Sequence, residues 1–111
     1  MTEVVLIKTF TFAAAHYLPF HYGKCKQLHG HTYKLEVYIK GEIKKDGMVC
    51  DFINIEREVR ELVLDKLDHH YLNDIVSNPT AENLCVWIKE RLPASTYKIR
   101  LWETETSGCE L

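Results

Sequence analysis

The chain has 111 residues, of which 46% are hydrophobic, and this composition suits one compact domain. Its 14 lysines and arginines are offset by 16 aspartates and glutamates, which gives a net charge of −2. That balance argues against a general nucleic-acid binder and against a protein that binds membrane surfaces through charge. A chain of this size buries only about two-thirds of its unfolded surface, so a metal or partner subunits are expected to add stability.

No signal peptide or membrane span is expected. The opening apolar run Val4-Val5-Leu6-Ile7 is short, and Lys8 follows it at once. The cysteines lack the dense spacing of a disulfide scaffold; they are Cys25, Cys50, Cys85 and Cys109. Reduced thiols in a cytoplasmic protein are the simpler interpretation.

Residues 4–16 are expected to form the first strand. Alternate positions in its second half share one face, and these are Phe10, Phe12, Ala14 and His16. His16 therefore extends an apolar face rather than a solvent face. Pro19 and Gly23 bracket the loop that follows.

The loop leads into C-K-Q-L-H-G-H, residues 25–31, which places one thiol and two imidazoles within seven positions. The alternation over residues 29–43 predicts a second strand. Its apolar face holds Tyr33, Leu35, Val37 and Ile39, and its polar face Lys34, Glu36, Tyr38 and Lys40. His29 and His31 share the parity of the apolar face. A buried imidazolium would be costly there, and a bound metal would offset that cost.

Two helices are expected after a turn at residues 44–47 and a short run at 48–50. Apolar residues at helical spacing predict the first over residues 54–67, with Asn54 or Asp51 as its N-cap. The second is predicted over residues 80–92, with Thr80 as its N-cap and Pro93 marking its end.

The last long strand is expected over residues 96–105. Tyr97, Ile99, Leu101 and Glu103 fall on one parity, and a carboxylate ending an apolar face is unusual because glutamate is rarely buried without a partner. Ser107-Gly108 is expected to turn the chain into a short strand at 109–111. The predicted class is α+β, an antiparallel sheet with a pair of helices on one face, in the sequence order ββααββ.

Three inward histidines at neighbouring strand ends could hold a metal ion. His16, His29 and His31 would give three nitrogens and leave an open position, which is typical of catalytic zinc. A closed four-ligand site that adds Cys25 remains open on spacing alone, and so does a set of simply hydrogen-bonded strand histidines. Lys24 and Lys26 flank Cys25, and nearby positive charge favours a thiolate that can act as base or nucleophile. By itself, Cys25 could equally be an ordinary loop cysteine.

Two further positions carry possible chemistry. Asp68-His69, between the helices, could orient an imidazole and relay protons, although such residues also often end helices. Glu103 could accept two hydrogen bonds from a planar, guanidine-like array of N–H donors. The alternatives for Glu103 are a salt bridge to a buried arginine or lysine, or an exposed strand end.

Five motifs lie along the chain: F-T-F-A-A-A-H (10–16), C-K-Q-L-H-G-H (25–31), L-D-H-H-Y-L-N (67–73), N-P-T-A-E-N (78–83) and W-E-T-E-T-S-G-C (102–109). Together they resemble the 6-pyruvoyl-tetrahydropterin synthase family. Within that family they are most similar to the carboxy-forming branch, the 6-carboxy-tetrahydropterin synthases of the queuosine (7-deazaguanine) pathway. The resemblance implies one domain over residues 1–111 with the tunnelling fold (T-fold). It also implies a homohexamer, a dimer of trimers with active sites at subunit interfaces.

The resemblance further implies a role for each candidate residue. His16, His29 and His31 match the zinc ligands, and Cys25 matches the catalytic cysteine. Asp68 and His69 match the rest of the catalytic triad, and Glu103 matches the glutamate that anchors the pterin ring. The implied substrate is 7,8-dihydroneopterin triphosphate, from which triphosphate is lost with zinc as Lewis acid and Cys25 as base.

The product depends on the branch of the family. The carboxy-forming branch also releases acetaldehyde, whereas the pyruvoyl-forming branch does not. Three residues separate Cys25 from His29, the spacing associated with the carboxy-forming branch, while pyruvoyl-forming relatives tend to have five. A 6-pyruvoyl-tetrahydropterin synthase and a non-catalytic, zinc-stabilised binding module remain the alternatives.

Two features depart from the family pattern. The chain ends at Leu111, so its last strand is shorter than usual. The loop over residues 17–24 is compact and offers few ligands for a triphosphate, of which His21, Lys24 and Lys26 are the candidates.

Overall fold

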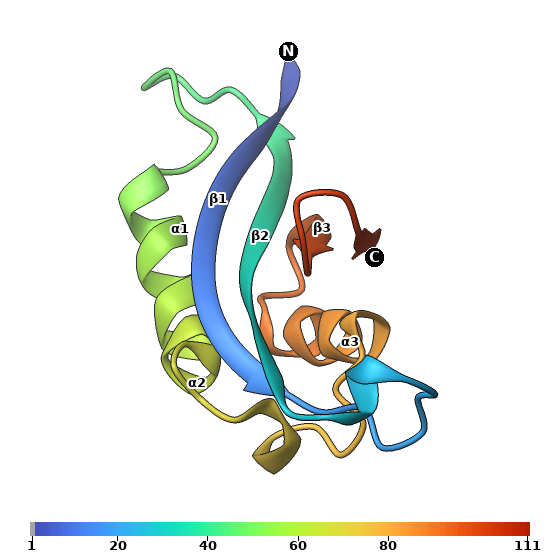
Figure 1. Cartoon of the computed structure of the whole chain (residues 1–111). Helices are drawn as coiled ribbons and strands as arrows, with labels where there is room; N and C mark the ends of the chain where they lie inside the picture. The colour runs from blue at the N-terminus through green and yellow to red at the C-terminus, as the bar shows by residue number, and fades with distance from the viewer. Residues whose placement is uncertain (1) are drawn as a thin grey trace.

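Two long strands form the frame of the molecule, which the computed structural model describes over residues 2–111. β1 (Glu3–His16) and β2 (His29–Glu42) pair antiparallel along their whole length, from Glu3 opposite Glu42 to His16 opposite His29. Figure 1 shows them as a curved two-stranded ribbon that runs the length of the molecule. Because of this register, the last residue of β1 and the first residue of β2 meet at one end.

Two shorter strands complete the sheet in the order β1-β2-β3-β4, and every pair is antiparallel. β3 (Thr96–Trp102) ends earlier than the predicted strand over 96–105, and a turn follows in which the Glu103 amide donates to the Ser107 carbonyl at 2.9 Å. β4 (Gly108–Glu110) starts at a residue predicted to lie in the turn. A Cβ on Gly108 would lie 2.5 Å from the Leu101 carbonyl oxygen, so only glycine fits there.

A β-bulge between β2 and β3 corrects the prediction for Tyr97. The register shifts between Tyr38 and Ile39, so that Tyr38 lies opposite Lys98 and Ile39 opposite Thr96. Tyr97 is left without a partner and is 50% exposed, whereas it was predicted to share the inner face with Ile99. Tyr38 was predicted on the polar face and does lie opposite Lys98 there, but it is only 7% exposed. The Lys98 ammonium and the Arg100 guanidinium lie 4.8 Å and 5.7 Å from its ring centre.

The first predicted helix is present and begins two residues earlier than expected. α1 (Phe52–Val59) continues through a π-helical segment, η2 (Arg60–Leu64), into α2 (Asp65–Leu67). Asp51 is the N-cap, since its carboxylate accepts a hydrogen bond from the Ile53 amide at 2.9 Å. The chain then turns into a short 3-10 helix, η3 (Leu72–Asp74).

The second predicted helix is confirmed as α3 (Ala81–Arg91). The Thr80 hydroxyl accepts from the Asn83 amide at 3.1 Å, as expected of an N-cap, and Pro93 follows the helix end. Across residues 2–111, no helix is both long enough and apolar enough to span a bilayer.

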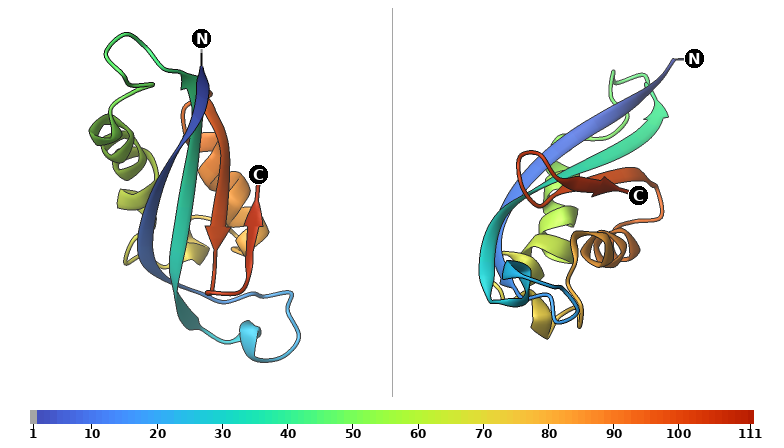
Figure 2. Two further views of the ribbon diagram at one scale, coloured as in Figure 1. Left: turned by 90° about the horizontal axis from the view of Figure 1, so that it is seen from above. Right: turned by 45° about the vertical axis from the view of Figure 1, so that its right-hand side comes forward.

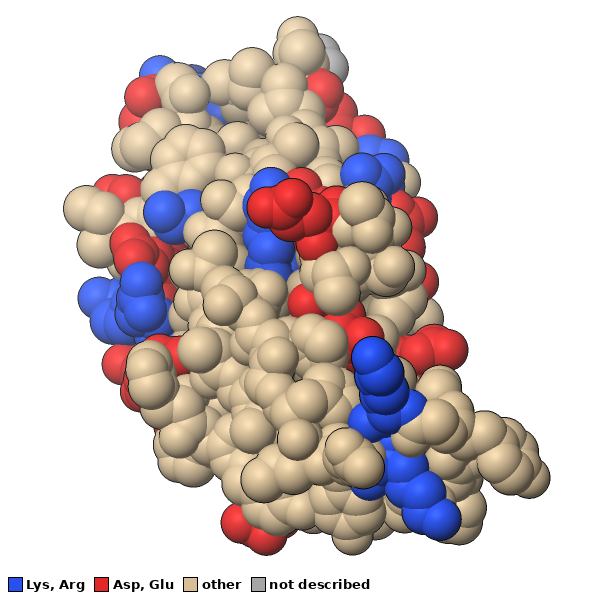
Figure 3. Space-filling model, in the orientation of Figure 1, with Lys and Arg blue, Asp and Glu red and all other residues tan. Residues whose placement is uncertain are grey.

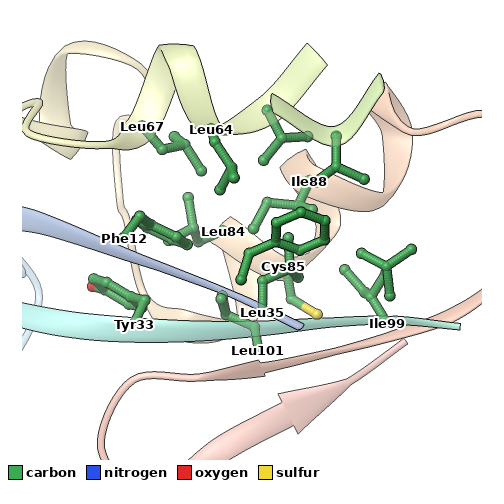
Figure 4. Close-up of a cluster of buried hydrophobic side chains, with 14 of the residues drawn as sticks. Phe12, Tyr33, Leu35, Leu64, Leu67, Leu84, Cys85, Ile88, Ile99 and Leu101 are labelled. Atoms are coloured by element: carbon green, nitrogen blue, oxygen red, sulfur yellow. The ribbon is translucent and has the colours of Figure 1, made fainter. Parts of the chain in front are cut away.

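The core lies between the helices and one face of the sheet, as Figure 4 shows. Phe12 and Tyr33, opposite each other on β1 and β2, stack with their ring centres 4.9 Å apart. The two views in Figure 2 show the sheet twisting above the helices, with the loop between β1 and β2 at one end. The predicted α+β architecture with the order ββααββ is therefore confirmed.

Candidate metal centre and active site

The three histidines come together where β1 ends and β2 begins. His16 lies opposite His29, and His31 lies opposite Ala14, so all three rings project from the core face at the same end of the strand pair. Their candidate ligand atoms lie within 4.8 Å of one another. His16 is fully buried, while His29 and His31 are half-buried. The convergence predicted from strand parity is confirmed.

Main-chain carbonyls fix the orientation of two of the rings. His16 Nδ1 donates to the Pro79 carbonyl at 2.8 Å, and His29 Nδ1 donates to the Gln27 carbonyl at 2.7 Å. Because a carbonyl can only accept, both Nδ1 atoms carry the proton, and each neutral ring keeps a lone pair on Nε2. Such second partners are typical of metal-binding histidines.

The two Nε2 atoms lie 3.0 Å apart, so their lone pairs face each other with no proton to share. Zn–N bonds of about 2.0–2.1 Å in a tetrahedral site place ligand nitrogens about 3.4 Å apart, which is close to this separation. His31 Nε2 is buried and has no hydrogen-bond partner, which is rare for a buried polar atom. A cation bound among the three nitrogens would resolve both features.

The protein also favours the neutral, metal-binding form of His16 and His31. Burial lowers the pKa of His16, and hydrogen bonding to Pro79 and the charge of Glu103 oppose that effect only in part. Burial likewise lowers the pKa of His31, again against the charge of Glu103. The residues present therefore fit a divalent metal ion such as zinc.

Cys25 lies outside this group of ligands. It sits in a 3-10 turn, η1 (Lys24–Lys26), and the candidate ligand set consists of the three histidines alone among residues 2–111. The closed four-ligand site that spacing had left open is therefore not formed. Cys25 is half-buried, and its carbonyl accepts from the Leu18 amide at 2.8 Å, which closes the compact loop before it.

Cys25 and Glu103 share a cavity of about 420 Å³. Its other lining residues include His21, Thr80, Glu82 and Cys109. Glu103 lies just after β3, and its carboxylate oxygens lie 3.7 Å from His31 Nε2 and 4.0 Å from His16 Nε2. No lysine or arginine within residues 2–111 pairs with it, so the salt-bridge alternative does not apply. Its carboxylate remains available to a ligand in this cavity.

Asp68 and His69 interact as the sequence suggested. His69 Nδ1 lies 3.0 Å from Asp68 Oδ1, and that oxygen also accepts from the Ala13 amide at 3.0 Å. The bond from Ala13, assisted by His69, lowers the pKa of Asp68 and keeps it ionised. His69 is exposed and has φ 60°, a left-handed conformation that is uncommon for residues other than glycine. His70 is also exposed, and its Nδ1 donates to the Asp68 carbonyl.

Cys25 and His69 line different cavities. His69 borders a second cavity of about 570 Å³, whose lining includes Ala13, Ala15, Gly30 and His31. In Figure 1, the loop between β1 and β2, which carries Cys25, lies on one side of the lower end of the β1–β2 ribbon, and α2, which directly precedes Asp68, lies on the other. The single chain does not bring the three expected catalytic residues into one cavity.

Three contributors to the site were not predicted. The carbonyls of Pro79 and Gln27 set the histidine tautomers, and main-chain atoms carry no sequence signal for such a role. The third is Asn73, whose side chain bonds the main chain of Tyr17, next to His16. The motifs 67–73 and 78–83 contain Asn73 and Pro79, and this was the only available signal.

Comparison with known proteins places the chain in a family. Residues 5–111 match the family described as 6-pyruvoyl tetrahydropterin synthase. The chain is 38% identical to a 6-carboxy-5,6,7,8-tetrahydropterin synthase of Haemophilus influenzae, over 93% of this chain and 94% of that protein. It is 42% identical to a dihydroneopterin monophosphate aldolase of Pyrococcus furiosus, over 96% of this chain and 95% of that protein.

The fold agrees with that match. The structure of Caenorhabditis elegans 6-pyruvoyl tetrahydropterin synthase superposes with a TM-score of 0.86 and 29% identity, over 100% of this chain and 96% of that one. The four-stranded antiparallel sheet with its helix pair is thus the T-fold expected from the sequence motifs. The chain belongs to the 6-pyruvoyl tetrahydropterin synthase family of enzymes.

Proposed function

We propose that this enzyme converts 7,8-dihydroneopterin triphosphate and one water molecule to 6-carboxy-tetrahydropterin, with release of triphosphate and acetaldehyde. We further propose that it serves queuosine (7-deazaguanine) biosynthesis in the cytoplasm. The observation that carries the proposal is the cluster of His16, His29 and His31 beside a cavity shared by Cys25 and Glu103. The name of the H. influenzae relative supports the product.

Each residue would act at a stated part of the substrate. A zinc ion held by the three histidines would supply Lewis acidity to the side-chain oxygens of the pterin. The Cys25 thiolate would remove a proton from the side chain. Glu103, with no competing cation, would accept hydrogen bonds from the N–H edge of the pterin ring and so orient the side chain toward the histidines.

The Asp68-His69 pair would relay protons on the opposite face of the side chain. Because one subunit places Cys25 and His69 in separate cavities, we infer that a neighbouring subunit completes the active site. The homohexamer implied by the family motifs, a dimer of trimers, would provide such an interface. Sedimentation that shows a stable monomer with full activity would contradict this inference.

The triphosphate would bind at the loop that carries Cys25. His21 lines the Cys25 cavity, and Lys24 and Lys26 are exposed in the adjoining turn. Figure 3 shows basic side chains gathered at the lower right, over the loop between β1 and β2, on a face that is otherwise largely uncharged there. Positive charge beside the reacting carbon would favour departure of the anionic leaving group.

Two other members of the family give alternative reactions. The three-residue spacing between Cys25 and His29 favours the carboxy-forming branch over a 6-pyruvoyl-tetrahydropterin synthase, which would eliminate triphosphate without releasing acetaldehyde. The 42% identity to the P. furiosus protein supports a second candidate, aldolase cleavage of dihydroneopterin monophosphate. A non-catalytic binding module is less well supported, since Cys25 does not close the metal site.

Product identification separates these candidates. Purified protein with measured zinc content is incubated separately with 7,8-dihydroneopterin triphosphate and with dihydroneopterin monophosphate. Triphosphate, acetaldehyde and a carboxylated pterin from the first substrate are the expected products. A pyruvoyl product without acetaldehyde would favour the pyruvoyl-forming reaction, and turnover of the monophosphate alone would favour the aldolase.

A further inference from the structure

Asn73 makes a two-point contact with the main chain beside the metal cluster. Its Nδ2 donates to the Tyr17 carbonyl at 2.9 Å, and its Oδ1 accepts from the Tyr17 amide at 2.9 Å. Tyr17 directly follows His16 at the end of β1. The side chain of Asn73 therefore satisfies both main-chain polar groups of Tyr17, the residue next to a candidate metal ligand.

This contact is the last in a row of bonds along one edge of β1. The His69 amide donates to the Ala13 carbonyl at 2.6 Å, and the Ala13 amide donates to Asp68 Oδ1 at 3.0 Å. The Ala15 amide donates to the His70 carbonyl at 3.3 Å. The segment 68–73 thus follows residues 13–17 like a short additional strand, opposite the edge that pairs with β2.

Successive residues of β1 alternate in direction, so the row of bonds involves every second residue and leaves the residues between them to face the core. Residues 13, 15 and 17 bond the segment 68–73, while the side chains of Ala14 and His16 point into the core. The same bonds hold His69 in its left-handed conformation, which persists only where its surroundings fix it. The metal-binding end of β1 and the Asp68-His69 pair are therefore joined by one hydrogen-bonded frame, which consists of residues 13–17 and 68–73.

We propose that Asn73 is a positioning residue that fixes His16 and the Asp68-His69 pair relative to each other. Asn73 anchors the far end of the frame, where β1 ends and no further strand pairing holds Tyr17. The inference rests on the metal-binding role proposed for His16. Asn73 itself touches neither the histidine cluster nor the cavity that Cys25 lines.

The test compares Asn73→Leu, which keeps the size of the side chain and removes both bonds, with Asn73→Asp. The aspartate keeps an acceptor for the Tyr17 amide but sets a second oxygen against the Tyr17 carbonyl. Zinc affinity is measured by chelator competition below the unfolding temperature. Loss of a partner that bonds a metal ligand directly typically weakens metal binding about 10- to 100-fold. Asn73 bonds the residue next to His16 rather than His16 itself, so we expect a loss of about 10-fold for Asn73→Leu, the lower end of that range. We also expect kcat to fall with little change in KM, because Glu103 is untouched.

Val59→Ala is the control, since it truncates a buried side chain in α1, away from the site. It should lower the unfolding temperature and leave zinc affinity unchanged. Hydrogen exchange of the metal-free proteins gives a second readout. Asn73→Leu should speed exchange at Ala13, Ala15 and His69 beyond the effect of Val59→Ala.

The outcomes separate this inference from the proposed function. If the wild-type protein binds no zinc, the metal assignment fails, and exchange in the metal-free proteins still decides the role of Asn73. If Asn73→Leu does not fold, Asn73→Asp takes its place in both measurements. Exchange and zinc affinity no different from those of Val59→Ala would overturn the inference.

Discussion

His16 and His29 face each other across the last pair of the β1–β2 ladder, with their Nε2 atoms 3.0 Å apart and both Nδ1 protons given to main-chain carbonyls. The arrangement presents two lone pairs to one point. The two lone pairs repel each other, and the strand pairing together with the hydrogen bonds to the Pro79 and Gln27 carbonyls holds the rings in place against that repulsion. Such a site is preorganised for a cation, because little rotation of the rings is needed on binding.

The first prediction concerns metal content. Purified protein should hold about one zinc per chain, and His29→Ala should lose most of it, since two remaining nitrogens bind zinc far more weakly than three. Metal analysis after gel filtration checks this. His70→Ala is the matched control, because His70 lies outside the cluster, and it should keep its zinc. Equal zinc in both variants would contradict the assignment.

Strand parity was enough to predict the metal cluster, because side chains alternate strictly along β1 and β2 where these strands are regular. The same rule failed at Tyr97, where the bulge opposite Tyr38 and Ile39 adds one residue and reverses the faces. A bulge depends on tertiary packing, and no local sequence pattern predicted this one. Parity could also not reveal that β3 ends at Trp102.

Other parts of the site depend on contacts between distant residues. The interaction of Asp68 with His69 was suggested by sequence, but the bond from the Ala13 amide that holds the carboxylate joins residues 55 positions apart. Nothing in the sequence indicated that Cys25 and His69 line separate cavities. That separation depends on where the fold holds the loop after β1 and the turn after α2, which local propensity does not determine.

The second prediction concerns Cys25. Cys25→Ala should keep its zinc and lose about 100-fold or more in kcat, the usual contribution of a general base. In the wild-type protein, alkylation should modify Cys25 before Cys85, because Cys85 is buried and its burial raises its pKa to about 12. Mass spectrometry of the partly alkylated protein with zinc bound locates the modification. Cys25 protected until zinc is removed would instead indicate that the thiol is a ligand.

The third prediction concerns Glu103. Glu103→Gln replaces one accepting oxygen by an N–H₂ group that would oppose the donors of the pterin edge. A hydrogen bond to a charged group contributes about 1.5–3 kcal/mol, so we expect KM to rise about 10- to 100-fold with zinc retained. Glu105→Gln is the control, because Glu105 is exposed beyond the end of β3. An unchanged KM in Glu103→Gln would rule out the anchoring role.

The fourth prediction concerns the pH dependence of stability through Asp68. The Ala13 amide and His69 lower the pKa of Asp68 in the folded protein, so its carboxylate stabilises the fold above the unfolded-state pKa of about 3.9. That contribution is lost as the pH falls through the lower, folded-state pKa. Asp68→Asn keeps an acceptor for Ala13 but has no proton to bind in this range.

We therefore compare the free energies of unfolding of the metal-free wild-type protein and metal-free Asp68→Asn. The advantage of the wild-type protein should be larger at pH 6 than at pH 2.5. The Asp68 side chain is 42% exposed, so solvent screening should keep this change below about 1 kcal/mol. Urea unfolding at the two pH values measures it, and carboxylates common to both proteins cancel in the comparison. A difference that does not change with pH would mean that the bond from the Ala13 amide does not favour the ionised carboxylate of Asp68.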